Sequence, residues 1–328
     1  MDKVERAVDD IRRKWVPDGR LGVFEVSLLP KGLAGITSSR DARDALRQLA
    51  ADAELVERVQ LIPEEHVPPA AIVTAALAPM VREPQVSAAR VSEVLHGEPL
   101  DVLERREDWL RVRAPDGYIA WVNTGYLATG PTDWADDWRE RATARALSAD
   151  IVTAEGRRRL PTGARVAFRR GVIELADGQR GAVAAGSVRR DQELLVEARH
   201  LAVPELAQKW YSGAPYLWGG RTEWGIDCSG LVQAVYAARG IQLPRDSDQQ
   251  FGQGKEIPVS ADGEGYESGD LLFFAERGRV SHVALWAGAG RIVHSALSRG
   301  GVGGDHLFGD DPRMARLREN LVGVRRCG

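Results

Sequence analysis

Cysteine is scarce in this sequence: the 328 residues contain only Cys228 and Cys327. A framework of several disulfides is therefore excluded. One bridge between these two residues would be an isolated link in a chain long enough to fold without it, so we interpret Cys327 as incidental, although the sequence leaves the pairing open.

Long apolar runs and basic tracts are missing as well. No run approaches the roughly 18 apolar residues that a membrane-spanning helix needs, so we expect no membrane partner. No tract of Lys and Arg stands out, and 44 such residues against 47 Asp and Glu give a formal net charge of -3. This balance argues against nucleic acid as a partner.

The start of the chain also lacks a feature, because residues 1–6 do not show the basic-then-apolar plan of a secretion signal. We therefore expect a cytoplasmic protein if Met1 is the native start. An extracellular or periplasmic protein from which a signal had been removed would have the same sequence.

The length predicts two to four domains. Residues 1–66 are predicted to be a helical segment, in which two amphipathic patterns flank a strand over 21–29. The second pattern follows a cap at Ser39 and extends to Val56. No residue of this segment suggests chemistry.

A change to short β-runs marks the next two regions, which repeat one another. We place the copies at 67–132 and 133–195, where Asp116-Gly117 and Asp177-Gly178 each join two alternating runs. Asp-Gly in that position is a strong hairpin signal, so each copy is predicted to be a small β-barrel. The first copy keeps four aromatic residues that would either face a ligand or fill the barrel: Trp109, Tyr118, Trp121 and Tyr126.

Residues 196–328 mix helical and strand periodicities, which predicts an α+β domain. Within it, Cys228 follows a Gly-rich loop and precedes an amphipathic helix, and Asp227 is a good N-cap. The unpaired N–H groups of a helix start favour a thiolate over a thiol. We therefore predict that Cys228 is a nucleophile.

Two histidines in consecutive strands supply its candidate partners. If 288–290 is the hairpin loop and residues 287 and 291 pair, His282 and His294 lie diagonally on one face of the sheet. His282 would then exchange the proton with Cys228, and His294 would orient the His282 ring. A one-residue slip would separate the two rings.

Other interpretations of the same residues remain open. A histidine in a strand is often a core or surface residue without chemistry. A metal site formed by Cys228, His282 and His294 is a further alternative, although no second cysteine or carboxylate stands at ligand spacing.

Six motifs in order give this region a specific resemblance. They are Tyr216-x-Trp218-Gly219-Gly220, Asp227-Cys228-Ser229-Gly230-Leu231, Leu243-Pro244-Arg245-Asp246-Ser247, Gly269-Asp270-Leu271, Ser281-His282-Val283-Ala284 and Val293-His294-Ser295-Ala296. Together they resemble the NlpC/p60 papain-like cell-wall peptidases, and the repeats before them resemble bacterial SH3-like domains. The resemblance implies a Cys228–His282–His294 catalytic set, with Tyr216 and the Cys228 backbone N–H as oxyanion donors.

The arrangement of two SH3-like domains before the peptidase domain is similar to that of γ-D-glutamyl-L-diamino-acid endopeptidases. It implies cleavage of short muropeptides after L-Ala-γ-D-Glu, before meso-diaminopimelate or L-lysine. Glu83, Tyr118 and Asp246 would hold the free ammonium of L-alanine, which a blocked amine could not replace. A solvated loop carboxylate is the alternative for Glu83. Ser229 and Ser247, helped by Arg245, would bind the α-carboxylate of D-glutamate, and Asp227 is a further expected substrate-binding residue.

This resemblance implies no cofactor and no metal, and we expect a monomer whose partner is the muropeptide. Two other functions remain open. One is an exported hydrolase acting on intact peptidoglycan, and the other is a non-catalytic module that binds the cell wall.

Overall fold

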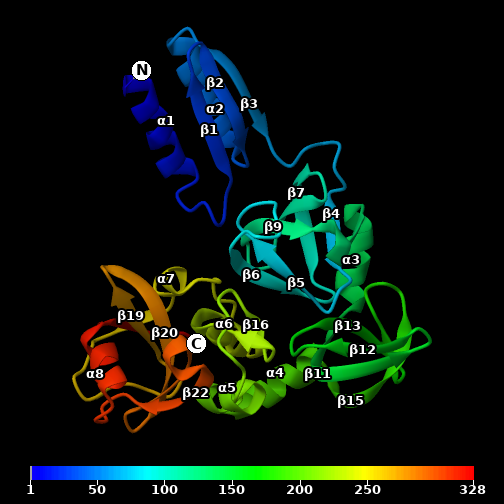
Figure 1. Cartoon of the computed structure of the whole chain (residues 1–328), viewed down its shortest axis with the longest axis vertical. Helices are drawn as coiled ribbons and strands as arrows, with labels where there is room; N and C mark the ends of the chain where they lie inside the picture. The colour runs from blue at the N-terminus through cyan, green and yellow to red at the C-terminus, as the bar shows by residue number, and fades with distance from the viewer. Residues whose placement is uncertain (1) are drawn as a thin grey trace. The chain divides into compact units, whose positions relative to one another are not determined.

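A computed structural model describes residues 2–328, and its helices and strands are labelled in Figure 1. Contacts divide the chain into two compact units. The first holds the residues up to Ile72, Val81–Ala89 and Pro99–Asp136, and the second holds Val73–Met80, Arg90–Glu98 and Asp137–Gly328. Two short segments of the first repeat thus belong with the carboxyl-terminal unit. The bounds of the four predicted domains stay predictions.

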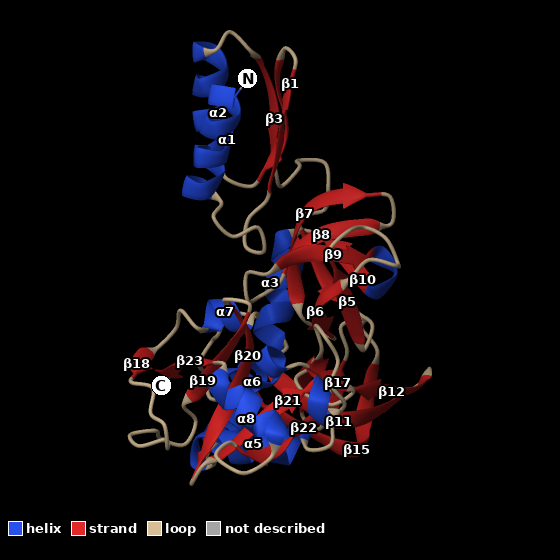
Figure 2. Cartoon of the chain, turned by 60° about the vertical axis from the view of Figure 1, so that its left-hand side comes forward, coloured by secondary structure: helices blue, strands red, loops and turns tan. Residues whose placement is uncertain are grey.

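The amino-terminal segment is a three-stranded sheet with two helices on one face, as Figure 2 shows. Strand β2 pairs antiparallel with β1 and parallel with β3. Leu33, Leu46 and Val59 are among the residues that form the core between the layers. The elements are α1 (Asp2–Trp15), β1 (Phe24–Leu29), β2 (Gly32–Thr37), α2 (Arg40–Asp52) and β3 (Val56–Leu61).

The predicted helices of this segment are present, but they pack on a sheet of which only the first strand was predicted. Both helices and the first strand are present, and Ser39 caps α2 by accepting a hydrogen bond from the Ala42 N–H at 3.1 Å. However, β2 and β3 were not predicted, and Val56 begins β3 instead of continuing the helix. Glu54 turns the chain with a φ of 52°, which separates α2 from β3.

The first repeat forms a seven-stranded sheet in the order β10-β4-β7-β8-β9-β5-β6. Trp121 is 2% exposed and lies beneath the guanidinium groups of Arg106 and Arg111, so this aromatic fills the barrel. Tyr126 is exposed. The elements are β4 (Ala70–Val73), β5 (Leu77–Val81), β6 (Arg90–Leu95), β7 (Pro99–Arg106), β8 (Trp109–Arg113), β9 (Ile119–Asn123), η1 (Thr124–Tyr126), β10 (Leu127–Gly130) and α3 (Thr132–Arg141).

The second repeat is a five-stranded sheet that closes on itself, because β11 pairs with both β13 and β15. Its interior holds small and aliphatic side chains such as Ala146, Ile151 and Ile173, so a core without Trp or Tyr suffices here. The strands are β11 (Ala144–Thr153), β12 (Gly156–Leu160), β13 (Arg165–Arg169), β14 (Val172–Glu174) and β15 (Arg180–Arg190).

The carboxyl-terminal region confirms the predicted α+β layout. A six-stranded antiparallel sheet in the order β18-β23-β19-β20-β21-β22 packs against a central helix, α6, that is buried along most of its length. The helices are α4 (Asp191–His200), α5 (Val203–Tyr211), α6 (Cys228–Ala238), α7 (Ser247–Gln250), η2 (Leu297–Arg299) and α8 (Pro312–Glu319). The strands are β16 (Arg221–Thr222), β17 (Gly225–Ile226), β18 (Lys255–Ile257), β19 (Leu271–Glu276), β20 (Arg279–Gly288), β21 (Arg291–Ala296), β22 (Gly301–His306) and β23 (Leu321–Arg326). Within residues 2–328, no helix is both long and apolar enough to span a bilayer.

His96 joins the two repeats inside the second unit. Its side chain is buried, Nδ1 lies 3.0 Å from the Thr74 carbonyl oxygen, and Nε2 accepts a hydrogen bond from the Ala176 N–H at 3.0 Å. These partners require a neutral ring with its proton on Nδ1. Burial lowers the pKa of His96. A second proton, on Nε2, would also displace the Ala176 N–H.

We predict that His96 makes the fold sensitive to mild acid. The unfolded chain takes up a proton at the ordinary histidine pKa of 6.5, whereas the folded chain resists it, so the free energy of unfolding falls as the pH drops below that value. Urea denaturation of wild type and His96→Gln at about pH 7 and about pH 5 checks this, because the interval spans the histidine range. The stability advantage of wild type should shrink toward pH 5; an advantage that is constant across this range would contradict the prediction.

Candidate functional site

The site is organised by the carboxylate of Asp227, which caps α6. Its Oδ1 accepts a hydrogen bond from the Gly230 N–H at 2.7 Å, as predicted for an N-cap, and its Oδ2 accepts one from the Gly219 N–H at 2.8 Å. Gly219 has a φ of 77°, and a Cβ there would lie 2.9 Å from Arg90 Cγ. One side chain therefore fixes both the helix start that carries Cys228 and the glycine loop before it.

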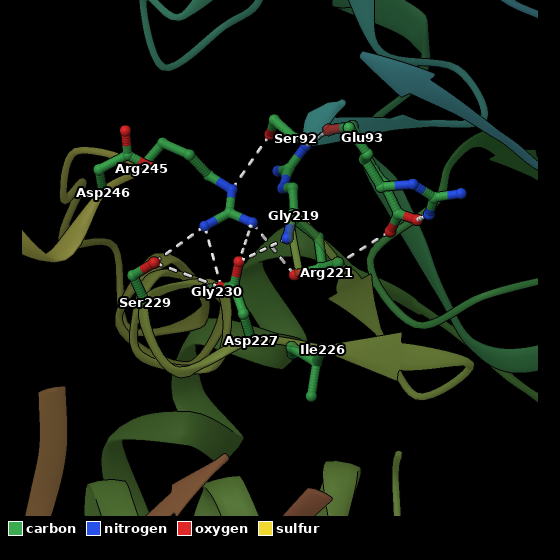
Figure 3. A network of polar contacts seen from close by, with 12 residues as sticks. Ser92, Glu93, Gly219, Arg221, Ile226, Asp227, Ser229, Gly230, Arg245 and Asp246 are labelled. Atoms are coloured by element: carbon green, nitrogen blue, oxygen red, sulfur yellow. Dashed lines mark hydrogen bonds and ion pairs between the residues drawn. The ribbon is translucent and has the colours of Figure 1, made fainter. Parts of the chain in front are cut away.

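Arg245 completes this network, as Figure 3 shows. Its side chain is fully buried, and its guanidinium binds Asp227 through two hydrogen bonds of 2.8 and 3.0 Å. Further donations reach the Ser229 hydroxyl at 3.0 Å, the Ser92 hydroxyl at 3.1 Å and the Gly220 carbonyl at 3.3 Å. The expected role of Arg245 as a ligand for a substrate carboxylate stays a prediction, and the contacts give it another role, which is to hold Asp227 and Ser229.

Strand β6 anchors the same loop through a second set of buried charges. The Arg221 N–H donates to Glu93 Oε2 at 3.0 Å, and the Arg221 guanidinium donates to the Glu93 carbonyl and to both oxygens of Glu98. Glu93 also pairs with Arg90, but burial outweighs these cations and raises its pKa. Sequence reasoning missed this set, because its members lie more than 120 residues apart in the chain.

The two predicted histidines lie on one face of the sheet. Leu285 pairs with Val293, as the predicted register requires, although a bulge near the turn pairs Gly288 instead of residue 287 with Arg291. His282 Nε2 and His294 Nδ1 are 2.8 Å apart. The slipped register is thereby excluded.

Asp305, which was not predicted, extends the hydrogen-bonded pair of His282 and His294. Asp305 on β22 places Oδ2 3.0 Å from His294 Nε2, and Arg299 donates to its Oδ1 at 2.6 Å. The available signal was weak, because β22 contains three glycines and does not resemble a strand. An acidic residue on the strand next to His294 was the feature that could have identified it.

Cys228 occupies the first position of α6, in the core that also contains Val283 on β20. The backbone N–H groups of Val283 and Ser229 lower the pKa of the thiol, but burial and the Asp227 charge raise it, to about 12. Burial and the neighbouring His294 lower the pKa of His282 to about 3. Both shifts favour the neutral forms, so burial opposes the thiolate that the helix start was predicted to favour.

The disulfide that the sequence left open does not form, since Cys228 and Cys327 are both free thiols. Within residues 2–328, no group of three or more His, Cys, Asp and Glu side chains is arranged to hold a metal ion.

Tyr216 lies in the glycine loop beside the nucleophile. Burial and the charge of Cys228 raise the pKa of its phenol, so the hydroxyl keeps its proton and can donate a hydrogen bond. Such a donor suits a developing oxyanion. The catalytic role of Tyr216 stays a prediction.

The remaining predicted residues belong to different parts of the fold. Asp246 and Ser247 begin α7, and Gln250 at its end donates to the Ser229 carbonyl at 3.0 Å, a link to α6 that the sequence did not reveal. Glu83 and Tyr118 belong to the first unit. Glu83 is exposed, whereas Tyr118 is 5% exposed, and their joint recognition of an ammonium stays a prediction.

Comparison with known proteins identifies two families in the chain. Residues 213–324 match the NlpC/P60 family, and residues 80–127 match the bacterial dipeptidyl-peptidase SH3 domain. The first match contains the cysteine, both histidines and Asp305, and the second falls within the first repeat.

Curated relatives agree with these families. The γ-D-glutamyl-L-lysine dipeptidyl-peptidase of Bacillus subtilis (strain 168) is 40% identical over 89 residues, which are 26% of this chain and 29% of the relative. The chain thus covers less than a third of that relative's length. Dipeptidyl-peptidase 6 of Lysinibacillus sphaericus is 28% identical over 247 residues, or 69% of this chain and 88% of the relative.

Among solved structures, an NlpC/P60 family protein from Bacillus cereus ATCC 10987 has the same fold. It superposes with a TM-score of 0.62 at 21% identity, over 78% of this chain and 99% of that protein. Residues 213–324 therefore form a domain that matches the NlpC/P60 family and has its fold, and a match to the bacterial dipeptidyl-peptidase SH3 domain precedes it in the sequence.

Proposed function

We propose that this protein is a cysteine peptidase of peptidoglycan stem peptides, which cleaves the bond between γ-D-glutamate and an L-diamino acid. The substrate is a short muropeptide with a free amino-terminal L-alanine, and the released product is L-Ala-γ-D-Glu. The observation that carries the proposal is the hydrogen-bonded pair of His282 on β20 and His294 on β21, two strands that contact α6, the helix that Cys228 begins. The names of the relatives, γ-D-glutamyl-L-lysine dipeptidyl-peptidase and dipeptidyl-peptidase 6, support the bond and the product.

The proposed reaction begins from the neutral thiol and imidazole. His282 takes the proton of Cys228 as the sulfur attacks the carbonyl carbon of the γ-glutamyl amide. Tyr216 and the Cys228 backbone N–H would stabilise the oxyanion. His282 then gives the proton to the leaving amine of the diamino acid, and a thioester remains, which water hydrolyses with His282 as base.

The requirement for a free L-alanine amine is the finer part of the proposal. Glu83, Tyr118 and Asp246 would surround the ammonium, and Ser229 and Ser247 would contact the D-glutamate carboxylate. A site built around a buried ammonium rejects a blocked amine, because its acceptors would then lose their donor. The cytoplasmic location and the monomeric state expected from the sequence remain proposals alongside it.

Hydrolysis of free and N-acetylated L-Ala-γ-D-Glu-diamino acid tripeptides tests this function. We expect mass spectrometry to detect L-Ala-γ-D-Glu from the free tripeptide and none with Cys228→Ala. The acetylated tripeptide should release at least about 100-fold less, because losing a required polar contact typically costs at least that factor. Equal turnover of both tripeptides would refute the ammonium requirement. Cleavage of intact peptidoglycan in preference to the tripeptide would favour the exported hydrolase.

The resting charge state gives a second prediction. Because burial raises the pKa of Cys228 to about 12, the rate of its alkylation by iodoacetamide should still increase above about pH 10, where an unperturbed cysteine levels off. Peptide mapping by mass spectrometry separates Cys228 from Cys327. A Cys228 rate that is already constant below about pH 8 would show a resting thiolate and contradict the prediction.

The Arg245→Lys variant separates a structural role from a ligand role. Lysine keeps the charge but loses the two-point contact with Asp227, so we expect the free energy of unfolding to fall by about 3 kcal/mol and kcat to fall with it. Urea denaturation and steady-state kinetics measure the two effects. If Arg245 acts mainly as a substrate ligand, KM will rise while the stability stays the same.

A further inference from the structure

The hydrogen-bonded line of His282, His294 and Asp305 ends in an ion pair between Asp305 and Arg299, which the sequence did not suggest. His294 and Asp305 are almost fully buried, with side chains 2% and 11% exposed, and Arg299 is about one-third exposed. Gly303 lies opposite His294 in β22, and a Cβ at this position would collide with the Arg299 guanidinium. The absence of a side chain at Gly303 is therefore what allows Arg299 to reach Asp305.

With both rings neutral, the contacts determine where the protons lie. An ionised Asp305 only accepts hydrogen bonds, so His294 Nε2 carries the proton at the 3.0 Å contact, and Nδ1 of a neutral His294 is an acceptor. His282 Nε2 must then donate to it at 2.8 Å. The remaining ring nitrogen of His282, Nδ1, is left without a proton and can accept one from a thiol.

We propose that Asp305 is a positioning residue, which acts through His294 to hold His282 in the tautomer whose Nδ1 can take the Cys228 proton. Arg299 assists by occupying the other carboxylate oxygen of Asp305. This inference rests on the proposed function for its biological role, because it assigns His282 as the base of the peptidase reaction. Beyond the two rings, Asp305 and Arg299 are in hydrogen-bond contact with this line, and Arg313 interacts electrostatically with Asp305.

The Asp305→Asn substitution is diagnostic because Arg299 only donates hydrogen bonds. The guanidinium will bind the asparagine oxygen, so the asparagine NH₂ group will face His294 Nε2. His294 must then carry its proton on Nδ1 and donate to His282 Nε2. The proton of His282 moves to Nδ1, where it blocks the base.

Removing Arg299 in the same protein should reverse this effect. In the double variant Asp305→Asn/Arg299→Met, the amide is free to turn and present its oxygen to His294, which restores both tautomers. Arg299→Met alone leaves the Asp305 carboxylate on His294. This single variant is the matched control, and we expect it to lose less activity than Asp305→Asn.

The experiment is alkylation of Cys228 by iodoacetamide at about pH 7, where the thiol needs His282 as its base, with Cys327 as internal reference. We expect Asp305→Asn to slow alkylation of Cys228 by about 100-fold and the double variant to recover about 10-fold or more, as general-base assistance is worth at least that much. The deficit of Asp305→Asn should shrink at high pH, where hydroxide removes the thiol proton directly. Unfolding curves of all four proteins show that each is folded.

If the two substitutions only weakened the structure, their effects would add, and the double variant would react more slowly than Asp305→Asn. That result would overturn the proposal. A wild-type rate in Asp305→Asn would overturn it as well. The alkylation readout does not involve a peptide, so failure to hydrolyse the tripeptide would refute the proposed function and leave this test intact. With the tripeptide as substrate, the same pattern should appear in kcat and not in KM.

Discussion

The buried ion pair between Asp227 and Arg245 is the interaction on which the site depends. Removing two charges from water is costly, and the cost is offset only where each charged atom has partners. Asp227 meets this condition, with the guanidinium and backbone N–H groups on its two oxygens. The pair also limits the electrostatic effect on Cys228, since the Asp227 charge raises the pKa of the thiol and the Arg245 charge lowers it.

Burial determines which protonation states of Cys228 and His282 are favoured at rest. Cys228 and His282 both lie where solvent does not stabilise a charge, so their pKa values move apart in the directions that keep both groups neutral. The thiolate and imidazolium therefore need stabilisation at the moment they form. The hydrogen bond from His282 to His294, and from His294 to Asp305, places a negative charge behind the imidazolium without placing one beside the sulfur.

Rules of local geometry predicted the centre of the site. Asp227 was identified because N-caps have a residue preference, and the histidine pair because strand residues alternate between faces. Contacts that are distant in sequence gave no such signal: the Ser92 hydroxyl accepts a hydrogen bond from Arg245, which lies 153 positions further along the chain. Local rules also failed in the amino-terminal segment, where the strand that begins at Val56 continues the apolar spacing of the helix before it. Helix position alone predicted a thiolate at Cys228, whereas burial, which raises the pKa of this thiol, follows only from the fold.

The buried contacts of β6 bear on what the first repeat does. Ser92 and Glu93 on this strand hold Arg245 and Arg221, which in turn fix the loop between Tyr216 and Cys228. A module that only bound the cell wall would not need to place buried charges against a catalytic loop, since leaving either partner unpaired would cost several kcal/mol. Strand β6 is therefore a structural part of the candidate site, whatever ligand the exposed residues of the repeat contact. This dependence also explains why Val73–Met80 and Arg90–Glu98 belong with the carboxyl-terminal unit instead of with the rest of their own repeat.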